Sequence, residues 1–228
     1  MLPPRAMLHR LSSRLKLLTG GARDLPERQR TLRATIEWSY ALLDEGEQLI
    51  FGGLAVFSGG RTLEAIEAIC DPEGDLPVEA FEGVSSLLDK SLLRQEEGPN
   101  GEPRFVMLET VHEFAREKLQ GSGEAEEIRR THAEYFLTLA EEASPQLRGP
   151  DQLEWLERLE AEHDNMRAAL SWALERKEAE VALRMGGALS WFCSVRGYHS
   201  EGRRWLQEAL AMEGRGSRCC RPRRCYRG

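Results

Sequence analysis

The chain has 228 residues, of which 41% are hydrophobic and 30% charged. This composition is typical of a globular protein with a buried core and excludes general disorder. The formal charge of −7 is a poor starting point for a nucleic-acid binder, which needs a basic face. No stretch approaches the ~18 uncharged apolar residues of a membrane span. With no secretory signal and two widely separated cysteines before the tail, Cys70 and Cys193, we expect a cytoplasmic protein.

The N-terminal residues have helical spacing. Pro3 and Pro4 suit the first turn of a helix, and leucines then recur at three- and four-residue steps until Gly20-Gly21, at Leu8, Leu11, Leu15 and Leu18. A second helix is expected over roughly 28–43, with its apolar residues on one side.

The next part of the chain has the element order of a winged helix-turn-helix. Asp44 and Glu47 have the spacing of a capping box for a third helix, and Thr62 is placed to cap a fourth. Helical spacing predicts another helix over roughly 77–89, and two short segments around the turn at 98–101 predict a β-hairpin. A helix then resumes at Glu109 and ends at Gly121-Ser122-Gly123.

From Glu124 onward the sequence is helical. Gly149-Pro150 separates one helix from a long one whose buried side we expect to hold Leu153, Leu156, Leu159, Met166, Leu170, Trp172 and Leu174. A helix, a Gly-Tyr turn and a last helix follow. Small and turn residues there resemble those of a tetratricopeptide repeat, namely Gly187, Ala188, Gly197, Tyr198 and Ala209. One or two such hairpins do not bury a solenoid core alone, because about three are usually needed.

The tail over 214–228 differs from everything before it. It holds six arginines, no acid and three of the five cysteines, so residues 1–213 carry a formal charge of −13. Three interpretations stay open: a basic arm that binds nucleic acid, a metal site, or a non-native C-terminus that stays disordered. The metal site lacks a fourth ligand and the paired spacing of zinc sites. We expect a disordered tail.

A search for catalytic motifs predicts no enzyme active site. No Gly-Lys-Ser/Thr of a phosphate-binding loop occurs, and no G-x-S-x-G elbow. The histidines do not pair as H-E-x-x-H, and we expect each to lie at the surface or its boundary; they are His9, His112, His132, His163 and His199.

The charge of the winged helix argues against direct DNA binding. Helix 77–89 carries Glu79, Glu82 and Asp89, with Lys90 just beyond its end. In the hairpin, Arg94 and Arg104 are outnumbered by Glu96, Glu97 and Glu102. Both elements are net negative, and DNA phosphates would be repelled.

Several long, colinear strings resemble the STAND class of bacterial signal-transduction ATPases. They are RLKLLTGGARDLPERQRTLRATIEWSYALLDEGEQLIFGGLAVFSGGRTLEAIEAIC, LLDKSLL, RFVMLETVHEFAREKL, RRTHAEYFLTLAEEA and LEAEHDNMRAALSWAL. The resemblance covers roughly residues 2–212. It implies an effector domain and a P-loop ATPase module, followed by a winged helix and a tetratricopeptide-like sensor array. ADP would hold the winged helix against the ATPase module, and exchange for ATP would release it.

The same resemblance places one motif. Members carry a Met-His-Asp triplet after the wing whose His contacts the nucleotide's β-phosphate, and the matching positions here are Met107, Leu108 and Glu109. Leu108 replaces the His and cannot donate a hydrogen bond, although Glu109 could cap the following helix. Alternatively, Met107 and Leu108 simply end a wing strand.

The sequence thus predicts a mainly α fold: a winged helix-turn-helix with one short β-hairpin, followed by antiparallel helical hairpins. The expected parts are a helical segment trailing an absent ATPase module (1–27), the winged helix (28–121), a helical tetratricopeptide-like domain (122–213) and the tail (214–228).

The expected function is that of a non-catalytic regulatory fragment of a STAND-type ATPase, which couples nucleotide state to a helical sensor array in transcriptional regulation. It would carry no cofactor itself, ATP or ADP and Mg²⁺ belonging to the parent family. Its partners would be proteins that contact the repeats and the absent ATPase module, with direct DNA binding and membrane contact not expected. The alternative is a DNA-binding winged-helix transcriptional regulator.

Overall fold

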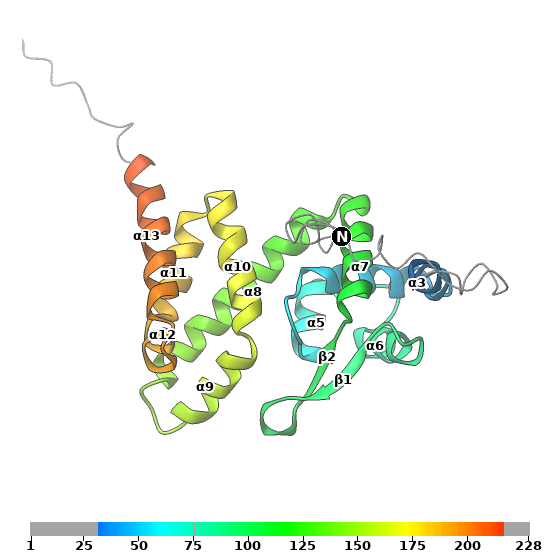
Figure 1. Ribbon diagram of the computed structural model, residues 1–228, viewed down its shortest axis with the longest axis horizontal. Helices are drawn as coiled ribbons and strands as arrows, with labels where there is room; N and C mark the ends of the chain where they lie inside the picture. The colour runs from blue at the N-terminus through cyan, green and yellow to red at the C-terminus, as the bar shows by residue number, and fades with distance from the viewer. Residues whose placement is uncertain (1–31, 75, 217–228) are drawn as a thin grey trace, which may run out of the picture. The chain divides into compact units, whose positions relative to one another are not determined.

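The computed structural model describes residues 32–74 and 76–216 (Figure 1). The expected N-terminal helix and the tail beyond residue 216 lie outside the described residues. The chain divides into two compact units, one reaching to His132 and the other starting at Ala133. This division falls inside one helix, and the predicted boundary between residues 121 and 122 stays a prediction.

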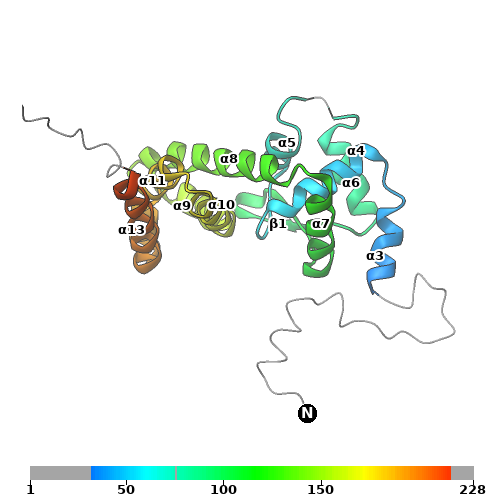
Figure 2. The same cartoon turned by 90° about the horizontal axis from the view of Figure 1, so that it is seen from above.

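The first unit has the expected order of helices and strands. Its elements are α3 (Leu32–Tyr40), α4 (Glu45–Gly53), a 3-10 turn (Leu54–Val56), α5 (Leu63–Cys70), α6 (Ala80–Asp89), β1 (Arg94–Glu97), a second 3-10 turn (Pro99–Gly101), β2 (Pro103–Val106), α7 (Glu109–Ser122) and the start of α8 (Ala125–Gln146). Helices α4, α5 and α6 pack against one another, and α7 packs on α4 and on the turn that follows it (Figure 2).

Two predicted helix starts are confirmed by their caps. The Asp44 side chain accepts a hydrogen bond from the Glu47 backbone N–H, and the Glu47 side chain accepts one from the Asp44 backbone, which completes the capping box. The Thr62 hydroxyl oxygen accepts a hydrogen bond from the Ala65 N–H at 3.2 Å and caps α5. Local sequence therefore fixes where these two helices begin.

Helix α6 begins at Ala80, three residues later than predicted. Pro77 and Val78 instead pack against α4, where a Cβ at Gly46 would lie 2.5 Å from Val78 Cγ1 and 3.0 Å from Pro77 Cγ. Gly83 on α6 faces Ile50 of α4 in the same way. Glycines on both helices thus let α6 and its leading segment approach α4 closely.

The predicted hairpin is present, and a third segment joins it. β1 and β2 pair antiparallel, with Arg94 opposite Val106 and Glu97 opposite Pro103. Arg61, in the connection between α4 and α5, forms an isolated bridge to Phe105 through two backbone hydrogen bonds of 2.8 and 3.1 Å. This bridge attaches the hairpin to the helices, which is the arrangement of a wing on a helix-turn-helix.

Aromatic side chains fill the core of the first unit. Tyr40, Phe51 and Phe114 form a triangle with ring-centroid distances of 5.3 to 6.2 Å, and Phe51 and Phe114 are fully buried. Because these rings come from α3, α4 and α7, the core joins helices that are far apart in the sequence.

The expectation that every histidine lies at or near the surface is wrong for His112, His132 and His163, whose exposed fractions are 8%, 2% and 5%. His112 Nε2 lies 3.1 Å from the carbonyl oxygen of Ala55, and the His132 ring meets Phe57 edge-on at 5.3 Å. Each imidazole fills space against aromatic or backbone groups, which the identity of a single residue in the sequence does not reveal. His199 is exposed as expected, and His9 lies outside the described residues.

The second unit consists of helices. It comprises the rest of α8, then α9 (Gln152–Ala161), α10 (His163–Arg176), α11 (Ala179–Ala188), α12 (Ser190–Arg196) and α13 (His199–Gly216). Helices α11 and α13 lie side by side, as do α10 and α11 (Figure 1). Helix α13 continues through residues 214–216, which we had assigned to the tail.

Two helices that we predicted as continuous are each divided in two. The first breaks at Glu162, a buried residue with φ −97° and ψ 2°, whose carboxylate accepts a 2.6 Å hydrogen bond from Asn165. The second breaks at Leu189, which is also buried. Neither break residue is a glycine or a proline, although Gly186 and Gly187 lie in the last turn before Leu189. Leu153, expected in the core, is 67% exposed.

An aromatic cluster holds the second unit together. The His163 ring lies 4.2 Å from the Tyr198 ring and 5.3 Å from the Phe192 ring. At the surface, Arg167 makes two 2.8 Å contacts with the Glu201 carboxylate, which join α10 to α13. Within 32–74 and 76–216, no helix is both long enough and apolar enough to cross a membrane.

Candidate nucleic-acid interface

Helix α6 occupies the recognition-helix position of the helix-turn-helix. Val84 and Leu87 face the core, with exposed fractions of 1% and 0%. At about 100° per residue, the remaining Phe81, Glu82, Ser85 and Asp89 fall within one sector of the helix. Phe81, which the helical spacing had placed with the core residues, is 62% exposed on that sector. The outer face of α6 therefore combines an aromatic ring with two carboxylates.

Lys90, at the end of α6, points back into the domain. Its ammonium donates to both carboxylate oxygens of Glu47, at 3.0 and 3.2 Å, and to the Ser86 hydroxyl, which also donates to Glu47. Burial alone would raise the pKa of Glu47, but the hydrogen bonds from Ser86 and Lys90 outweigh it and lower the pKa. Glu47 stays ionised and fastens α6 to α4, and Lys90 is occupied within the protein.

The two basic residues of the wing, Arg94 and Arg104, differ in their exposure to solvent. Arg104 is 8% exposed, and its guanidinium donates a 2.7 Å hydrogen bond to the carbonyl oxygen of Gly60. Arg94 is exposed on β1. All three glutamates of the hairpin are exposed as well, at Glu96, Glu97 and Glu102.

The structure thus makes the outer surface of α6 and the wing more acidic than the sequence count implied. Two of the three basic residues within 80–106 make hydrogen bonds inside the domain, and Arg94 alone of these three is exposed. All five acidic residues of this segment are exposed. Sequence reasoning missed this because charge counting does not tell which side chains fold inward. The one available signal was the position of Lys90 at a helix end, four residues after Ser86.

The three site residues taken from the family motif lie where β2 leads into α7. Met107 is half-buried, and Leu108 is 44% exposed and precedes α7 without a side-chain cap. Glu109 occupies the first turn of α7, where the negative charge of its carboxylate interacts favourably with the positive end of the helix dipole. The role of these three residues in nucleotide contact stays a prediction. Among the described residues, no group of three or more His, Cys, Asp or Glu side chains could hold a metal ion.

Comparison with known families identifies the class of domain. Residues 43–120 match the winged helix-turn-helix domain family. This segment runs from the end of the α3–α4 connection to the last turns of α7, and it contains the three packed helices and the wing described above. The chain therefore contains a winged helix-turn-helix domain, and the predicted fold class is confirmed.

The similar full-length proteins are mycobacterial. "Putative HTH-type transcriptional regulator Rv0890c" of Mycobacterium tuberculosis is 37% identical over 195 residues, which is 86% of this chain and 22% of that protein. "Putative HTH-type transcriptional regulator Mb0914c" of Mycobacterium bovis matches to the same extent. An uncharacterized M. tuberculosis protein, Rv0894, is 34% identical over 133 residues, 56% of this chain and 32% of its own length. No solved structure matches the chain significantly.

These comparisons support a regulatory function at a coarse level. The chain spans about a fifth of the length of the first relatives, at 22%. These relatives are several times longer than the segment that matches this chain. The comparisons favour the DNA-binding alternative over the expectation that direct DNA binding does not occur, because a winged helix-turn-helix is a common DNA-binding fold.

Proposed function

We propose that this chain is a regulatory segment of a larger transcriptional regulator, and that its winged helix acts by binding rather than by catalysis. The observation that carries this proposal is the match of residues 43–120 to a winged helix-turn-helix domain with its wing attached. The two mycobacterial relatives named as HTH-type regulators support it.

The first candidate mode, which the family match and these names favour, is direct contact with duplex DNA. In this mode α6 enters the major groove, with Phe81 and Ser85 toward the base edges and Arg94 toward a phosphate. Glu82 and Asp89 share the α6 face and oppose phosphate, so the proposal predicts weak binding at physiological salt. Removing these two charges should strengthen it.

The test compares two charge-neutralised pairs in the full chain. Fluorescence anisotropy with labelled duplex DNA at ~50 mM salt measures Kd for the wild type, for E82Q/D89N and for a control, E142Q/E154Q. Glu142 and Glu154 are exposed residues of the second unit, so the control changes net charge equally. We expect E82Q/D89N to lower Kd about tenfold, because each removed phosphate repulsion strengthens binding. Equal gains in both variants, or no binding by either, would contradict contact through α6.

A second candidate is favoured by a specific observation: residues 43–120 hold 17 acidic and six basic residues. In this mode the acidic winged helix with its exposed Phe81 contacts protein, as the resemblance to STAND ATPases implies. The ATPase module would precede it, the helices of the second unit would start a tetratricopeptide-like array, and Met107, Leu108 and Glu109 would face the nucleotide.

This second mode predicts that the 228-residue chain by itself does not bind nucleotide. Isothermal titration with ADP and Mg²⁺ should give no heat of binding at micromolar concentrations, because no phosphate-binding loop is present in the sequence. Micromolar affinity would contradict this mode. Failure of E82Q/D89N to bind DNA, together with no nucleotide binding, would favour it over the first.

A further inference from the structure

A hollow with a mixed polar and apolar lining opens between four parts of the first unit. It has a volume of about 430 Å³ and is lined from α4, from the end of α5, from the loop after α5 and from the start of α8. Leu49, Ile69, Leu76 and Ile128 make its apolar wall. Leu49 is 37% exposed even though it belongs to a helix packed on three others. Leu76 and Ile128 are half-buried and Ile69 is buried, so Leu49 offers most of the accessible apolar surface that a binding partner could cover.

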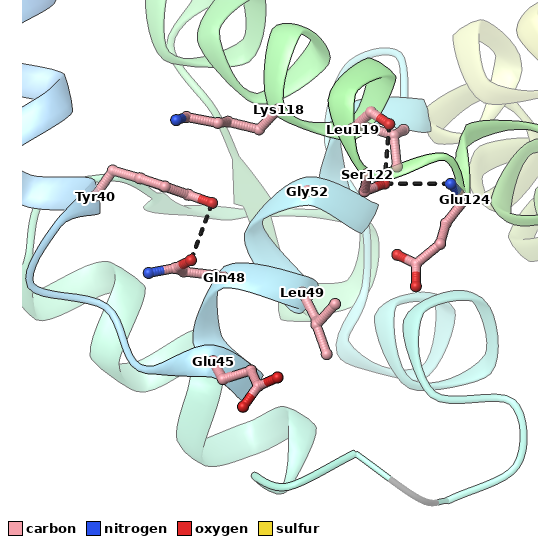
Figure 3. Close-up of a pocket in the computed structure, with 9 residues that line it drawn as sticks. All are labelled: Tyr40, Glu45, Gln48, Leu49, Gly52, Lys118, Leu119, Ser122 and Glu124. Carbon is pink, nitrogen blue, oxygen red and sulfur yellow. Dashed lines mark hydrogen bonds between the residues drawn. The ribbon is translucent and has the colours of Figure 1, made fainter.

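A second hollow of about 200 Å³ adjoins the first and shares Leu49 and Glu124 with it. Figure 3 shows this second hollow, with the carboxylates of Glu45 and Glu124 on either side of Leu49. The Lys118 ammonium lies 4.5 Å from the centroid of the Tyr40 ring. The basic residue of the hollow is therefore engaged with an aromatic side chain, which leaves the carboxylates as the dominant charges.

The edges of the two hollows are acidic. Glu45 comes from α4, Glu73 from the loop after α5, Glu124 from the position just before α8, and Glu127 from the first turn of α8. All four residues are exposed. An apolar wall edged by carboxylates from three separate elements suits an occupant with an apolar stripe and basic residues beside it.

The chain itself contains a segment of that chemistry. Between residues 1 and 23 there are five basic residues and no acidic one. On a helix of 100° per residue, the leucine stripe described above spans about 80°. Arg10 and Arg14 would then lie to one side of the stripe, and Arg5 and Lys16 to the other. The C-terminal tail over 214–228 holds six arginines but no Leu, Ile, Val, Met or Phe.

The length of the connection permits contact. Tyr40, which lines the second hollow, is the last residue of α3, and the first residue of α3 lies about 12 Å away along the helix axis. Residues 19–31 number thirteen and reach up to about 43 Å when extended. The segment can therefore reach either hollow from the start of α3.

We propose that residues 5–18 dock on the joined hollows of their own winged-helix unit, with the leucines on the apolar wall and the basic residues beside Glu45, Glu73, Glu124 and Glu127. Docking would cover the surface between α4, α5 and α8. It would make the winged helix responsive to whatever acts on the N-terminal segment. The proposal does not depend on whether the winged helix binds DNA or protein.

Hydrogen–deuterium exchange of the full chain tests the proposal by mass spectrometry of peptides within residues 5–18. The variant E124K/E127K reverses two charges at the edge, and the control E96K/E97K makes the same change on two exposed residues of the wing. We expect amides of 5–18 to exchange about tenfold faster in E124K/E127K than in the wild type, because two ion pairs become repulsions. The control should differ from the wild type by less than about twofold.

Swapping the charges between the segment and the hollow distinguishes loss of docking from a general folding defect. R10E/R14E alters only the segment and should raise its exchange as much as E124K/E127K does. Combining all four substitutions should restore protection. Fast exchange in the wild type, equal exchange in E124K/E127K and the control, or protection that rises with protein concentration would each overturn intramolecular docking. The last result would assign the surface to a second copy of the chain.

Discussion

At the scale of single residues, the buried imidazole of His112 makes the stability of the protein depend on pH. His112, on α7, is 8% exposed and lies 3.1 Å from the carbonyl oxygen of Ala55, to which the neutral ring donates a hydrogen bond. Burial is the largest cause that lowers its pKa, and together with the nearby positive charges of Arg116 and Arg61 it brings the pKa to about 4. The ring is therefore neutral at pH 7 and links α7 to the 3-10 turn after α4.

This pKa predicts acid sensitivity. The folded-state pKa lies below the unfolded value of about 6.5, so the unfolded chain takes up the proton first as the pH falls. The contribution is fully present above pH 6.5 and is lost as the pH falls through about 4. We expect this residue to remove roughly 3 kcal/mol of stability across that window. Urea unfolding of H112Q should show a flatter pH dependence than the wild type.

The matched control is H199Q, which changes an exposed histidine on α13. It should keep the pH dependence of the wild type. If H112Q and the wild type lose stability in parallel between pH 6.5 and 4, then another group carries the acid sensitivity.

At the scale of elements, some boundaries are set by residues close in the sequence and others by tertiary contacts. The sequence allowed the starts of α4 and α5 to be predicted because Asp44, Glu47 and Thr62 satisfy helix-end N–H groups within a few residues. The hairpin could also be predicted, because its two strands and its turn lie within thirteen residues of the chain. The start of α6 depends on packing of Pro77 and Val78 against Gly46, a distant segment, which periodicity does not report. Periodicity also did not reveal the breaks at Glu162 and Leu189, because buried residues continue across both.

The candidate site followed the same division. Its location on α6 and the wing could be predicted from the order of elements. Its charge could not be predicted fully, because Lys90 and Arg104 turn inward to partners 43 and 44 residues away. The exposed position of Phe81 was missed because an aromatic residue at helical spacing normally belongs to the core.

The contact between α4 and the segment before α6 provides a test of this packing. G46A places a Cβ 2.5 Å from Val78 Cγ1, and it should destabilise the protein by about 1–3 kcal/mol as overpacking does. G52A, in the same helix, has no atom within 4 Å of the new Cβ. It should stabilise by up to about 1 kcal/mol through helix propensity. Chemical denaturation of both variants measures the difference, and equal stabilities would show that α6 adjusts freely.

At the scale of the whole molecule, charge is segregated along the chain. Residues 32–213 hold 36 acidic and 18 basic residues, whereas residues 1–31 hold seven basic and two acidic ones and the tail holds six arginines. The net charge of −7 therefore conceals a strongly acidic central region between two basic ends. Repulsion within the centre opposes compactness, and the ends offset it only in part.

Screening of these charges by salt should show whether repulsion within the acidic centre or its attraction to the basic ends is larger. Raising salt from ~20 to ~200 mM shortens the Debye length to below about 10 Å, and we expect Tm to rise by roughly 2–5 °C as acidic repulsion weakens. Removing residues 217–228 deletes five arginines and takes the formal charge to −12, so the truncated chain should show a larger rise. Differential scanning calorimetry of both proteins across the salt series makes the comparison. A fall in Tm with salt would mean that attraction between the basic ends and the acidic centre outweighs the repulsion within that centre. In that case truncation should weaken the dependence on salt.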